Sequence, residues 1–267
     1  MTANDEIDTG RPHPARVYDY WLNGHSHYEA DAAAAERVVQ VWPGVVMGAR
    51  LNREFMHRAT RWLVREAGVR QFLDIGTGIP TEPNLHQVAQ AIAPETRVVY
   101  ADNDPIVLHQ AQKLLTGSPE GRTAYLHADF TEPRSILEAP ALRETLDLGR
   151  PVALSLIALL HFITDERGAY EIVRTLMDAL PSGSFLVVSH ATADFDPDLL
   201  TRVAEAYQST VAEGQIRSSS EVNRFFEGLE LVDPGVVVAH RWRPDGDVQP
   251  DITDAEFPVY GGVARKP

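Results

Sequence analysis

The chain has 267 residues, of which 44% are hydrophobic, so it carries enough apolar side chains for a sizeable folded core. Its formal net charge is −14, and we therefore predict neither a nucleic-acid partner nor a membrane partner. The absence of cysteine excludes disulfides, thiolate metal sites and a cysteine nucleophile.

At this length the chain can hold one large α/β domain with an appended helical segment. No apolar run is long enough to cross a bilayer, and the first residues show neither a basic region nor an apolar region typical of a secretory signal. We therefore expect a cytoplasmic protein.

The first seventy residues contain helical patterns and no strand pattern. An aromatic-rich stretch at 15–22 is followed by an Asn-Gly turn, and helical propensity or helical spacing of apolar residues follows over 31–40 and 48–67. We predict that residues 1–69 form a helical cap, followed by a sheet domain over residues 70–267.

The sheet domain opens with Gln-Phe-Leu-Asp-Ile-Gly-Thr-Gly-Ile-Pro-Thr at residues 71–81. This short apolar run reaches Asp74 and then breaks at Gly76 and Gly78, after which apolar residues recur at helical spacing. Strand, glycine turn and helix form the first unit of a doubly wound α/β sheet, and such sheets bind nucleotides at this turn. Glycine accepts positive φ and allows a ligand to approach the backbone closely.

Strand and helix patterns alternate after this turn. The strand patterns lie at 97–101, 124–127, 151–158 and 184–189, and the helical patterns at 106–115, 133–146 and 165–180. This order predicts an α/β fold with a doubly wound, mainly parallel sheet.

The last seventy residues depart from the alternation. A helical pattern at 198–213 is followed by a capping-box sequence from Ser218 to Glu221, and then by strand patterns at 229–232, 235–240 and 257–265. Strands joined by loops without a crossover helix pair antiparallel, so we expect antiparallel strands at the C-terminal edge.

Acidic residues stand where successive strands end. Asp74-x-Gly76-x-Gly78 ends the first strand, Asp102 the second and Asp129 the third. Together with the closing antiparallel strands, this arrangement resembles the class I S-adenosylmethionine-dependent methyltransferases, and the resemblance extends from residue 71 to the C-terminus.

Several longer stretches sharpen the resemblance. They are Ala-Arg-Val-Tyr-Asp-Tyr-Trp-Leu-Asn-Gly at 15–24, Arg-Leu-Asn-Arg at 50–53, Leu-Asp-Ile-Gly-Thr-Gly-Ile-Pro-Thr at 73–81 and Tyr-Gly-Gly-Val-Ala-Arg-Lys-Pro at 260–267. They resemble an actinobacterial S-adenosylmethionine methyltransferase family of largely undefined substrate. The resemblance implies a Rossmann-like methyltransferase fold and S-adenosyl-L-methionine as cofactor.

The glycine turn is expected to bind the amino-acid part of that cofactor. Gly76 and Gly78 allow the backbone to approach it, and Thr77 lies between them. Asp74 either orders this loop or meets the cofactor ammonium through water. Capping of a turn is the alternative role for Asp74.

The end of the second strand is expected to bind the ribose. A carboxylate accepts two hydrogen bonds from vicinal hydroxyls, so Asp102 suits this position, with Asn103 beside it. Asp104 takes the role instead if the strand ends later.

The third and fourth strands supply the remaining cofactor candidates. Asp129 can accept a hydrogen bond from the adenine amino group, and Phe130 either stacks on the ring or belongs to the core. Ser155 lies where the fourth strand passes the cofactor, and a buried structural hydroxyl is its alternative role.

The glycine turn also distinguishes between cofactors. Where NAD-binding domains carry a third glycine near the pyrophosphate, this chain has Ile79-Pro80-Thr81. A sulfonium ligand has no pyrophosphate, which favours S-adenosylmethionine. A nicotinamide-dependent oxidoreductase and a non-catalytic S-adenosylmethionine-binding regulatory protein remain alternatives.

The methyl acceptor is expected to be a small molecule. His161 follows the fourth strand and is the candidate general base, with a structural histidine as the alternative and His190 as a weaker candidate. We predict no metal site, since His25-x-His27 is only a weak chelating pair.

The helical cap is expected to close over the site. Tyr18, Asn23 and Arg50 are its candidate contacts with cofactor or acceptor, because aromatic rings with polar tips suit a wall that excludes water. The alternative is a helical layer that covers the sheet and contributes to a homo-oligomer.

Overall fold

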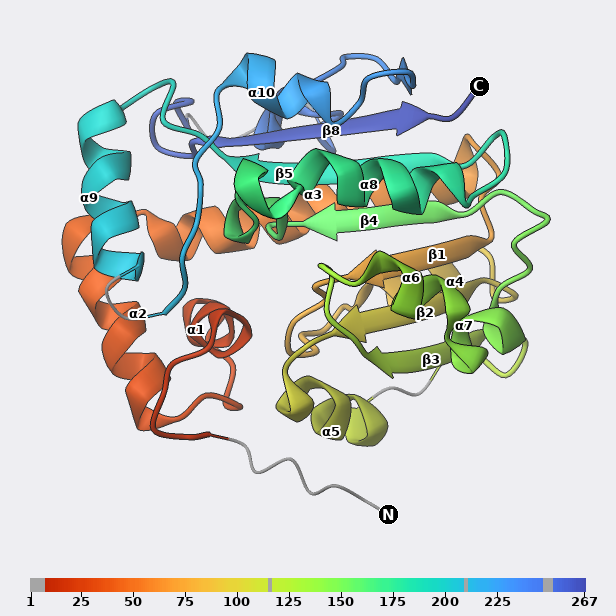
Figure 1. Cartoon of the computed structure of the whole chain (residues 1–267), viewed down its shortest axis with the longest axis horizontal. Coiled ribbons are helices and arrows are strands. Elements are labelled where there is room, and N and C mark those ends of the chain that lie inside the picture. Colours follow the sequence, from red (N-terminus) through yellow and green to blue (C-terminus); the bar gives the residue numbers. More distant parts are fainter. Residues whose placement is uncertain (1–7, 115–116, 209–210, 247–251) are drawn as a thin grey trace.

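A mainly parallel sheet lies at the centre of the molecule (Figure 1). The computed structural model describes residues 8–114, 117–208, 211–246 and 252–267. Five parallel strands follow the order β3-β2-β1-β4-β5. They are β1 (Gln71–Ile75), β2 (Arg97–Asp102), β3 (Arg122–His127), β4 (Ala153–Ile157) and β5 (Phe185–Ala191). The doubly wound fold predicted from the alternating pattern is confirmed.

The C-terminal edge of the sheet is antiparallel, as predicted. Strand β8 (Val259–Arg265) pairs with β5, and the short strands β6 (Glu230–Leu231) and β7 (Val237–Val238) pair with β8. The second predicted C-terminal strand pattern, at 235–240, ends early, because residues after Val238 turn into the 3₁₀ helix η3 (Ala239–Arg241).

Helices cover both faces of the sheet, with α3 behind it and α6 and α8 in front in the view of Figure 1. The helices of the sheet domain are α4 (Leu85–Gln90), α5 (Pro105–Leu114), α6 (Pro133–Glu138), α7 (Pro140–Thr145), α8 (Ala169–Asp178) and α10 (Ser219–Arg224). The predicted capping box is present, since the Ser218 amide donates to Glu221 Oε2 at 2.7 Å.

Two predicted helices are each divided. The pattern over 133–146 breaks between α6 and α7, where Ala139 takes an extended ψ of 128° in front of Pro140. Proline disfavours helical geometry in the residue before it. The pattern over 165–180 divides into the 3₁₀ helix η2 (Asp165–Arg167) and α8, which are separated by Gly168 at a φ of 77°.

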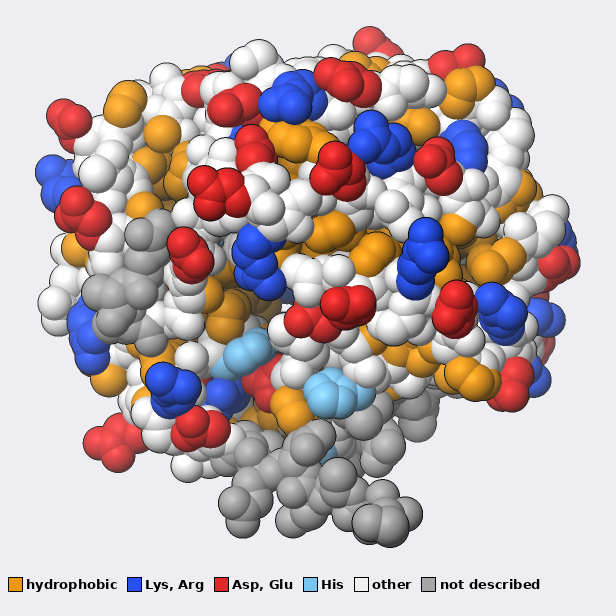
Figure 2. All heavy atoms as spheres, viewed as in Figure 1, with side chains coloured by type: hydrophobic (Ala, Val, Ile, Leu, Met, Phe, Trp, Pro, Cys, Tyr) orange, Lys and Arg blue, Asp and Glu red, His pale blue; other side chains and the backbone are white. Residues whose placement is uncertain are grey.

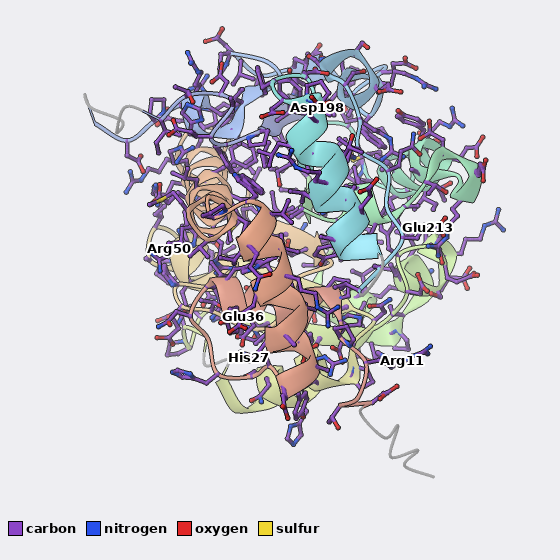
Figure 3. The ribbon with its side chains drawn as sticks, turned by 90° about the vertical axis from the view of Figure 1, so that its left-hand side faces the viewer. Arg11, His27, Glu36, Arg50, Asp198 and Glu213 are labelled. Atoms are coloured by element: carbon purple, nitrogen blue, oxygen red, sulfur yellow. The ribbon has the colours of Figure 1, made fainter. Side chains whose placement is uncertain are left out.

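Three helices and the start of a fourth form a layer across the carboxyl ends of the parallel strands. They are α1 (Pro14–Trp21), α2 (Glu29–Val41), α9 (Pro197–Gln208) and the N-terminal end of α3 (Val45–Arg65). Figure 3 shows α2 and α9 side by side, although they are far apart in sequence. Residues 209–210 of the helix predicted over 198–213 lie outside the described part of the chain.

The helical layer has its own apolar cluster, which includes Val17, Ala35 and Val38 and packs against Val203 and Tyr207 of α9. Helix α3 takes part in this cluster at its N-terminal end and in the main core of the sheet further on. A division of the chain at residue 69 therefore stays a prediction.

The surface view adds two observations. On the face shown in Figure 2, acidic and basic side chains are interspersed, with no gathering of one sign. Within the described residues, no helix has the length and apolarity that a membrane span requires.

Candidate functional site

A cavity of about 560 Å³ lies where the parallel strands end beneath the helical layer. The carboxyl ends of parallel strands meet at one edge of a sheet, so the loops after β1, β2, β3 and β4 all reach this space. Residues of helices α1, α2, α3 and α9 line the rest of the cavity. We call the part lined by the loops after β1, β2, β3 and β4 the strand-end side.

The glycine turn after β1 forms part of the cavity wall. Gly76 and Gly78 have φ angles of 70° and 66°, a conformation that favours glycine. A Cβ atom at Gly76 would lie 2.7 Å from the end of the Leu159 side chain, so that side chain would have to move to accept another residue there. At Gly78 the nearest atom to such a Cβ would be 4.0 Å away, on Ala15 of α1, so open space lies before the backbone there.

Asp74 stands at the end of β1 and lines the cavity. Burial raises the pKa of its carboxyl to about 6, and hydrogen bonding to the Ser155 and Thr77 side chains opposes that rise. Ser155 lies opposite Asp74 in the β1–β4 register and is buried. Ser155 does not line the cavity and its hydroxyl supports Asp74 from inside the sheet, a position that fits the alternative role of a buried structural hydroxyl.

Asp102 ends β2 and connects two neighbouring loops. Its Oδ2 accepts from the Gly78 amide at 2.8 Å, and its Oδ1 accepts from the Asp104 amide at 3.0 Å. Burial raises the pKa of this carboxyl, and the two N–H donors oppose the rise. Asp102 and Asn103 both line the cavity.

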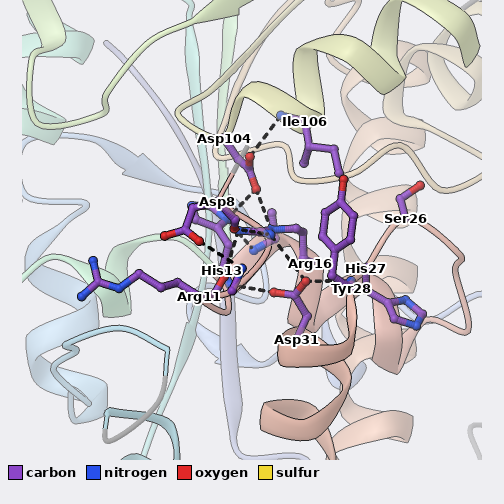
Figure 4. Close-up of polar contacts among 12 residues, drawn as sticks. Asp8, Arg11, His13, Arg16, Ser26, His27, Tyr28, Asp31, Asp104 and Ile106 are labelled. Carbon is purple, nitrogen blue, oxygen red and sulfur yellow. Dashed lines mark hydrogen bonds and ion pairs between the residues drawn. The ribbon is translucent and has the colours of Figure 1, made fainter. Parts of the chain in front are cut away.

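Asp104, the alternative candidate, is turned toward the helical layer (Figure 4). Its Oδ2 lies 3.2 Å from Arg16 Nε and 3.1 Å from His13 Nδ1. Arg16 also lies 3.6 Å from Asp31 of α2. The side chains at 102 and 104 thus divide between the cavity and the helical layer.

The loop after β3 brings Asp129 and Phe130 to the cavity. Asp129 is exposed, and its Oδ1 accepts from the Thr131 amide and hydroxyl, both at 2.8 Å. Phe130 is buried, and it belongs to the main core as well as to the cavity wall. Both alternatives stated for Phe130 are therefore compatible with its position.

Helix α3 contributes a polar part of the wall through Asn52, which meets Tyr18, an expected cap contact that lines the cavity. Asn52 Nδ2 donates to the Tyr18 hydroxyl at 3.0 Å, and that hydroxyl donates to the Ala49 carbonyl at 2.9 Å. Asn52 Oδ1 is buried without a hydrogen-bond partner among the described residues. An unpaired acceptor beside carboxylates suits a ligand that presents hydroxyl and ammonium donors.

Arg50 and Asn23, two of the expected cap contacts, do not line the cavity. The stripe of α3 that faces the cavity holds residues 45, 48, 49, 52, 53 and 56, and Arg50 lies outside it on the exposed surface (Figure 3). Arg53 lines the cavity instead, and its Nη2 donates to the Pro83 carbonyl at 2.9 Å. Asn23 is exposed with a φ of 61°, so it forms the turn after α1, in a conformation that asparagine tolerates.

Two histidines face each other at the far end of the cavity. His161 lies in the 3₁₀ helix η1 (Leu160–Phe162), and its ring centroid is 5.6 Å from that of His190 on β5. His161 Nδ1 is buried without a hydrogen-bond partner among the described residues. Burial, followed by the charge of Arg217, lowers the pKa of His161 to about 4, so this imidazole is neutral near pH 7.

His190 has no such unpaired nitrogen. Its Nδ1 lies 2.7 Å from the Ala191 carbonyl and therefore carries the hydrogen. Its Nε2 then accepts from Arg217 Nη1 at 2.9 Å. Of the two candidate bases, His161 alone has a ring nitrogen without a hydrogen-bond partner among the described residues.

Arg217 is a buried cation that sequence reasoning missed. It donates to the Leu160 and Ile163 carbonyls at 2.9 and 2.8 Å, and its Nη2 lies 2.6 Å from Asp165 Oδ1. These contacts hold the loop that carries His161 from both sides. The only sequence signal was an arginine just before the Ser218 capping box, which does not distinguish it from an exposed arginine.

Comparison with known proteins gives a consistent result. A family model described as S-adenosyl methyltransferase matches residues 1–267. A crystal structure of a DUF574 family protein from Streptomyces avermitilis has 53% sequence identity and a TM-score of 0.95, and the alignment covers 98% of this chain and 100% of that one. A candidate methyltransferase from Thermobifida fusca has 37% identity and a TM-score of 0.91, with 100% and 99% covered.

More distant structures share the fold. Human N-acetylserotonin methyltransferase in complex with S-adenosylmethionine aligns with a TM-score of 0.51 at 15% identity, over 96% of this chain and 63% of that one. No curated protein matches the chain.

The contacts of Arg217 generate a prediction about His161. The Arg217→Met substitution removes the nearby positive charge, so the pKa of His161 should rise from about 4, while burial still keeps it below its ordinary value. The measurement is an NMR titration of the His161 ring, with Arg224→Met as the control at a more exposed arginine. We expect the substitution also to lower the free energy of unfolding by roughly 3 kcal/mol. An unchanged His161 pKa in a folded Arg217→Met protein would contradict this assignment.

Proposed function

The chain belongs to the S-adenosyl methyltransferase family and uses S-adenosylmethionine as methyl donor, and we propose that it transfers the methyl group to a small molecule bound beside His161. The observation that carries the proposal is the cavity itself. The cavity joins the strand-end side, which is rich in hydrogen-bond acceptors, to a second region around His161, whose Nδ1 is unpaired among the described residues.

The strand-end residues fit the cofactor. Asp102 would accept from the ribose hydroxyls, and Asp74 with Asn52 Oδ1 would face the ammonium. Arg53 would pair with the cofactor carboxylate, and Asp129 and Phe130 would meet the adenine. When bound, S-adenosylmethionine supplies a methyl group on a positively charged sulfur.

His161 would receive the proton of a hydroxyl acceptor. As the acceptor oxygen bonds to the methyl carbon, the carbon–sulfur bond breaks and its electron pair stays on sulfur. The hydroxyl proton becomes strongly acidic in this step, so an imidazole with a pKa of about 4 is a sufficient base. His161 Nδ1 has no protein partner among the described residues, which leaves it able to accept that proton.

The helical layer would act as a closing cap. Arg16 of α1 is buried, and its ion pair with Asp104 joins the cap to the loop that begins at Asp102. Because α1 also faces Gly78 across the cavity, exchange of the cofactor would require this layer to move. Closure would exclude water from the reacting groups.

A small molecule is the favoured acceptor for two reasons. The cavity lies beneath the helical layer, which restricts access for a polymer. The net charge of −14 and the interspersed charges on the face in Figure 2 offer no broad basic surface for nucleic acid.

The proposal is tested by calorimetry followed by an acceptor screen. We expect S-adenosylmethionine and S-adenosylhomocysteine to bind with one site per chain and NAD not to bind. A screen of small hydroxyl compounds, read by mass spectrometry, should then yield a methylated product. Binding of NAD without S-adenosylmethionine would reject the proposal.

Asp74 should make cofactor affinity depend on pH. Below its pKa of about 6 the carboxyl is protonated and loses its attraction for the ammonium, so affinity should fall as the pH falls through 6. Between pH 7 and pH 5 we expect a loss of roughly tenfold for S-adenosylmethionine, measured by calorimetry. The Asp74→Asn protein should bind more weakly at pH 7 and show a flat profile. An equally steep profile in Asp74→Asn would show that another group titrates.

Substitution of Arg16 tests whether the helical layer closes over the cofactor. Arg16→Met breaks the ion pair with Asp104, so the closed layer should become less stable and the Kd for S-adenosylhomocysteine should rise at least roughly tenfold. Arg37→Met changes an exposed arginine of α2 and serves as the matched control. A folded Arg16→Met protein with wild-type affinity would contradict a closing role.

His161 tests the acceptor side. With a hydroxyl acceptor from the screen, His161→Phe should lower kcat by roughly 10²-fold to 10⁴-fold, because no group then receives the proton. The Kd for S-adenosylhomocysteine should stay within about twofold of the wild-type value, since His161 lies outside the strand-end side. Unchanged turnover would leave His161 with a structural role only.

A further inference from the structure

The cap side of the cavity is an apolar wall. It is built from Trp21 of α1, Val38 of α2 with Trp42 just after that helix, and Leu200, Val203 and Tyr207 of α9. The α9 residues follow helical spacing, so one continuous side of that helix faces the cavity. We call these six residues the cap wall.

Aromatic rings connect the cap wall to His161. The Trp21 and Tyr207 centroids are 6.1 Å apart, Tyr207 and Phe162 are 5.7 Å apart at an interplanar angle of 30°, and Phe162 and His161 are 4.4 Å apart. Aromatic rings offer large apolar contact area to an aromatic molecule, by offset or edge-to-face packing. The row ends at His161, which also lines the cavity.

The charged side chains that line the cavity lie outside the cap wall. The cap wall holds no ionisable group that is charged near neutral pH, because burial raises the pKa of its one phenol, Tyr207. Asp74 and Asp102 stand at strand ends, and Arg53 of α3 donates to the Pro83 carbonyl. The exposed Arg167 and Glu213 line the same cavity but do not belong to the cap wall. A charged group placed against the cap wall would lose its hydration without gaining a partner.

Resting on the proposed function, we propose that the methyl acceptor is a neutral, flat aromatic compound whose hydroxyl is presented to His161. Its apolar body packs on the cap wall and its hydroxyl hydrogen-bonds to His161 Nδ1. Among the six cap-wall residues an aromatic carboxylate finds no cation, and an aromatic ammonium finds no carboxylate.

Matched probes on one ring system test this inference. They are 2-naphthol, 2-naphthoate, 2-naphthylmethylammonium and unsubstituted naphthalene, each titrated into the full-length protein saturated with S-adenosylhomocysteine, with binding read by fluorescence. We expect 2-naphthol to bind at least roughly tenfold more tightly than either charged probe. A charged probe that binds as tightly as 2-naphthol would overturn the inference.

Two variants locate the binding. Ala204→Phe fills the α9 side of the cavity and should weaken the binding of 2-naphthol at least roughly tenfold. Glu205→Phe changes the next residue, which is exposed, and should leave the affinity for 2-naphthol unchanged. His161→Phe keeps the ring but removes the acceptor nitrogen, so it should abolish the preference for 2-naphthol over naphthalene. Wild-type 2-naphthol affinity in folded Ala204→Phe, or an unchanged preference in His161→Phe, would contradict the inference.

The control titration separates the two proposals. S-adenosylhomocysteine should bind wild type, Ala204→Phe and His161→Phe within about twofold of one another, because none of these changes reaches the strand-end side. If it fails to bind wild type, the proposed function fails. The probe series is then measured on the ligand-free protein, where the same ranking is still expected and a different ranking overturns the acceptor class.

Discussion

The rest of the site depends on the hydrogen bonds that fix the turn after β2. The two oxygens of Asp102 accept from the amides of Gly78 and Asp104, so one buried carboxylate holds the glycine turn of β1 against the end of β2. Two residues further on, Asp104 points the other way and pairs with Arg16 of α1. A single short turn therefore contacts both the cofactor side of the cavity, through Asp102, and the helical cap, through Asp104.

At the opposite end of the cavity, the buried cation Arg217 helps to keep the His161 imidazole neutral. Arg217 has several carbonyl and carboxylate partners, so its charge is satisfied although the side chain is fully buried. It occupies Nε2 of His190 and disfavours a charged imidazole at His161. The result is a pair of histidines with different surroundings, one fixed by its hydrogen bonds and one with a ring nitrogen that has no partner among the described residues.

Much of the fold could be predicted from sequence, because the glycine turn and the alternation of apolar strands with amphipathic helices are local patterns. The positions of Asp74 and Asp102 could also be predicted from the sequence, since residues at the ends of parallel strands lie at one common edge of the sheet. The rest depends on contacts distant in sequence. Whether Arg50 or Arg53 faces the cavity is decided by the rotation of α3, and the role of Ser155 depends on its register against Asp74. Arg217 and the α9 side of the cap wall required knowledge of how the second half of the chain packs on the first.

The central claim is that the carboxylates at the strand ends and the polar stripe of α3 bind one adenosyl ligand beneath the cap. A crystal structure with S-adenosylhomocysteine tests it most directly. The account predicts ribose hydroxyls within hydrogen-bond distance of Asp102, with the ammonium facing Asp74 and Asn52 and α1 lying over the ligand. A nucleoside bound away from Asp102, or one that leaves Asn52 Oδ1 and Asp74 without contact, would contradict it.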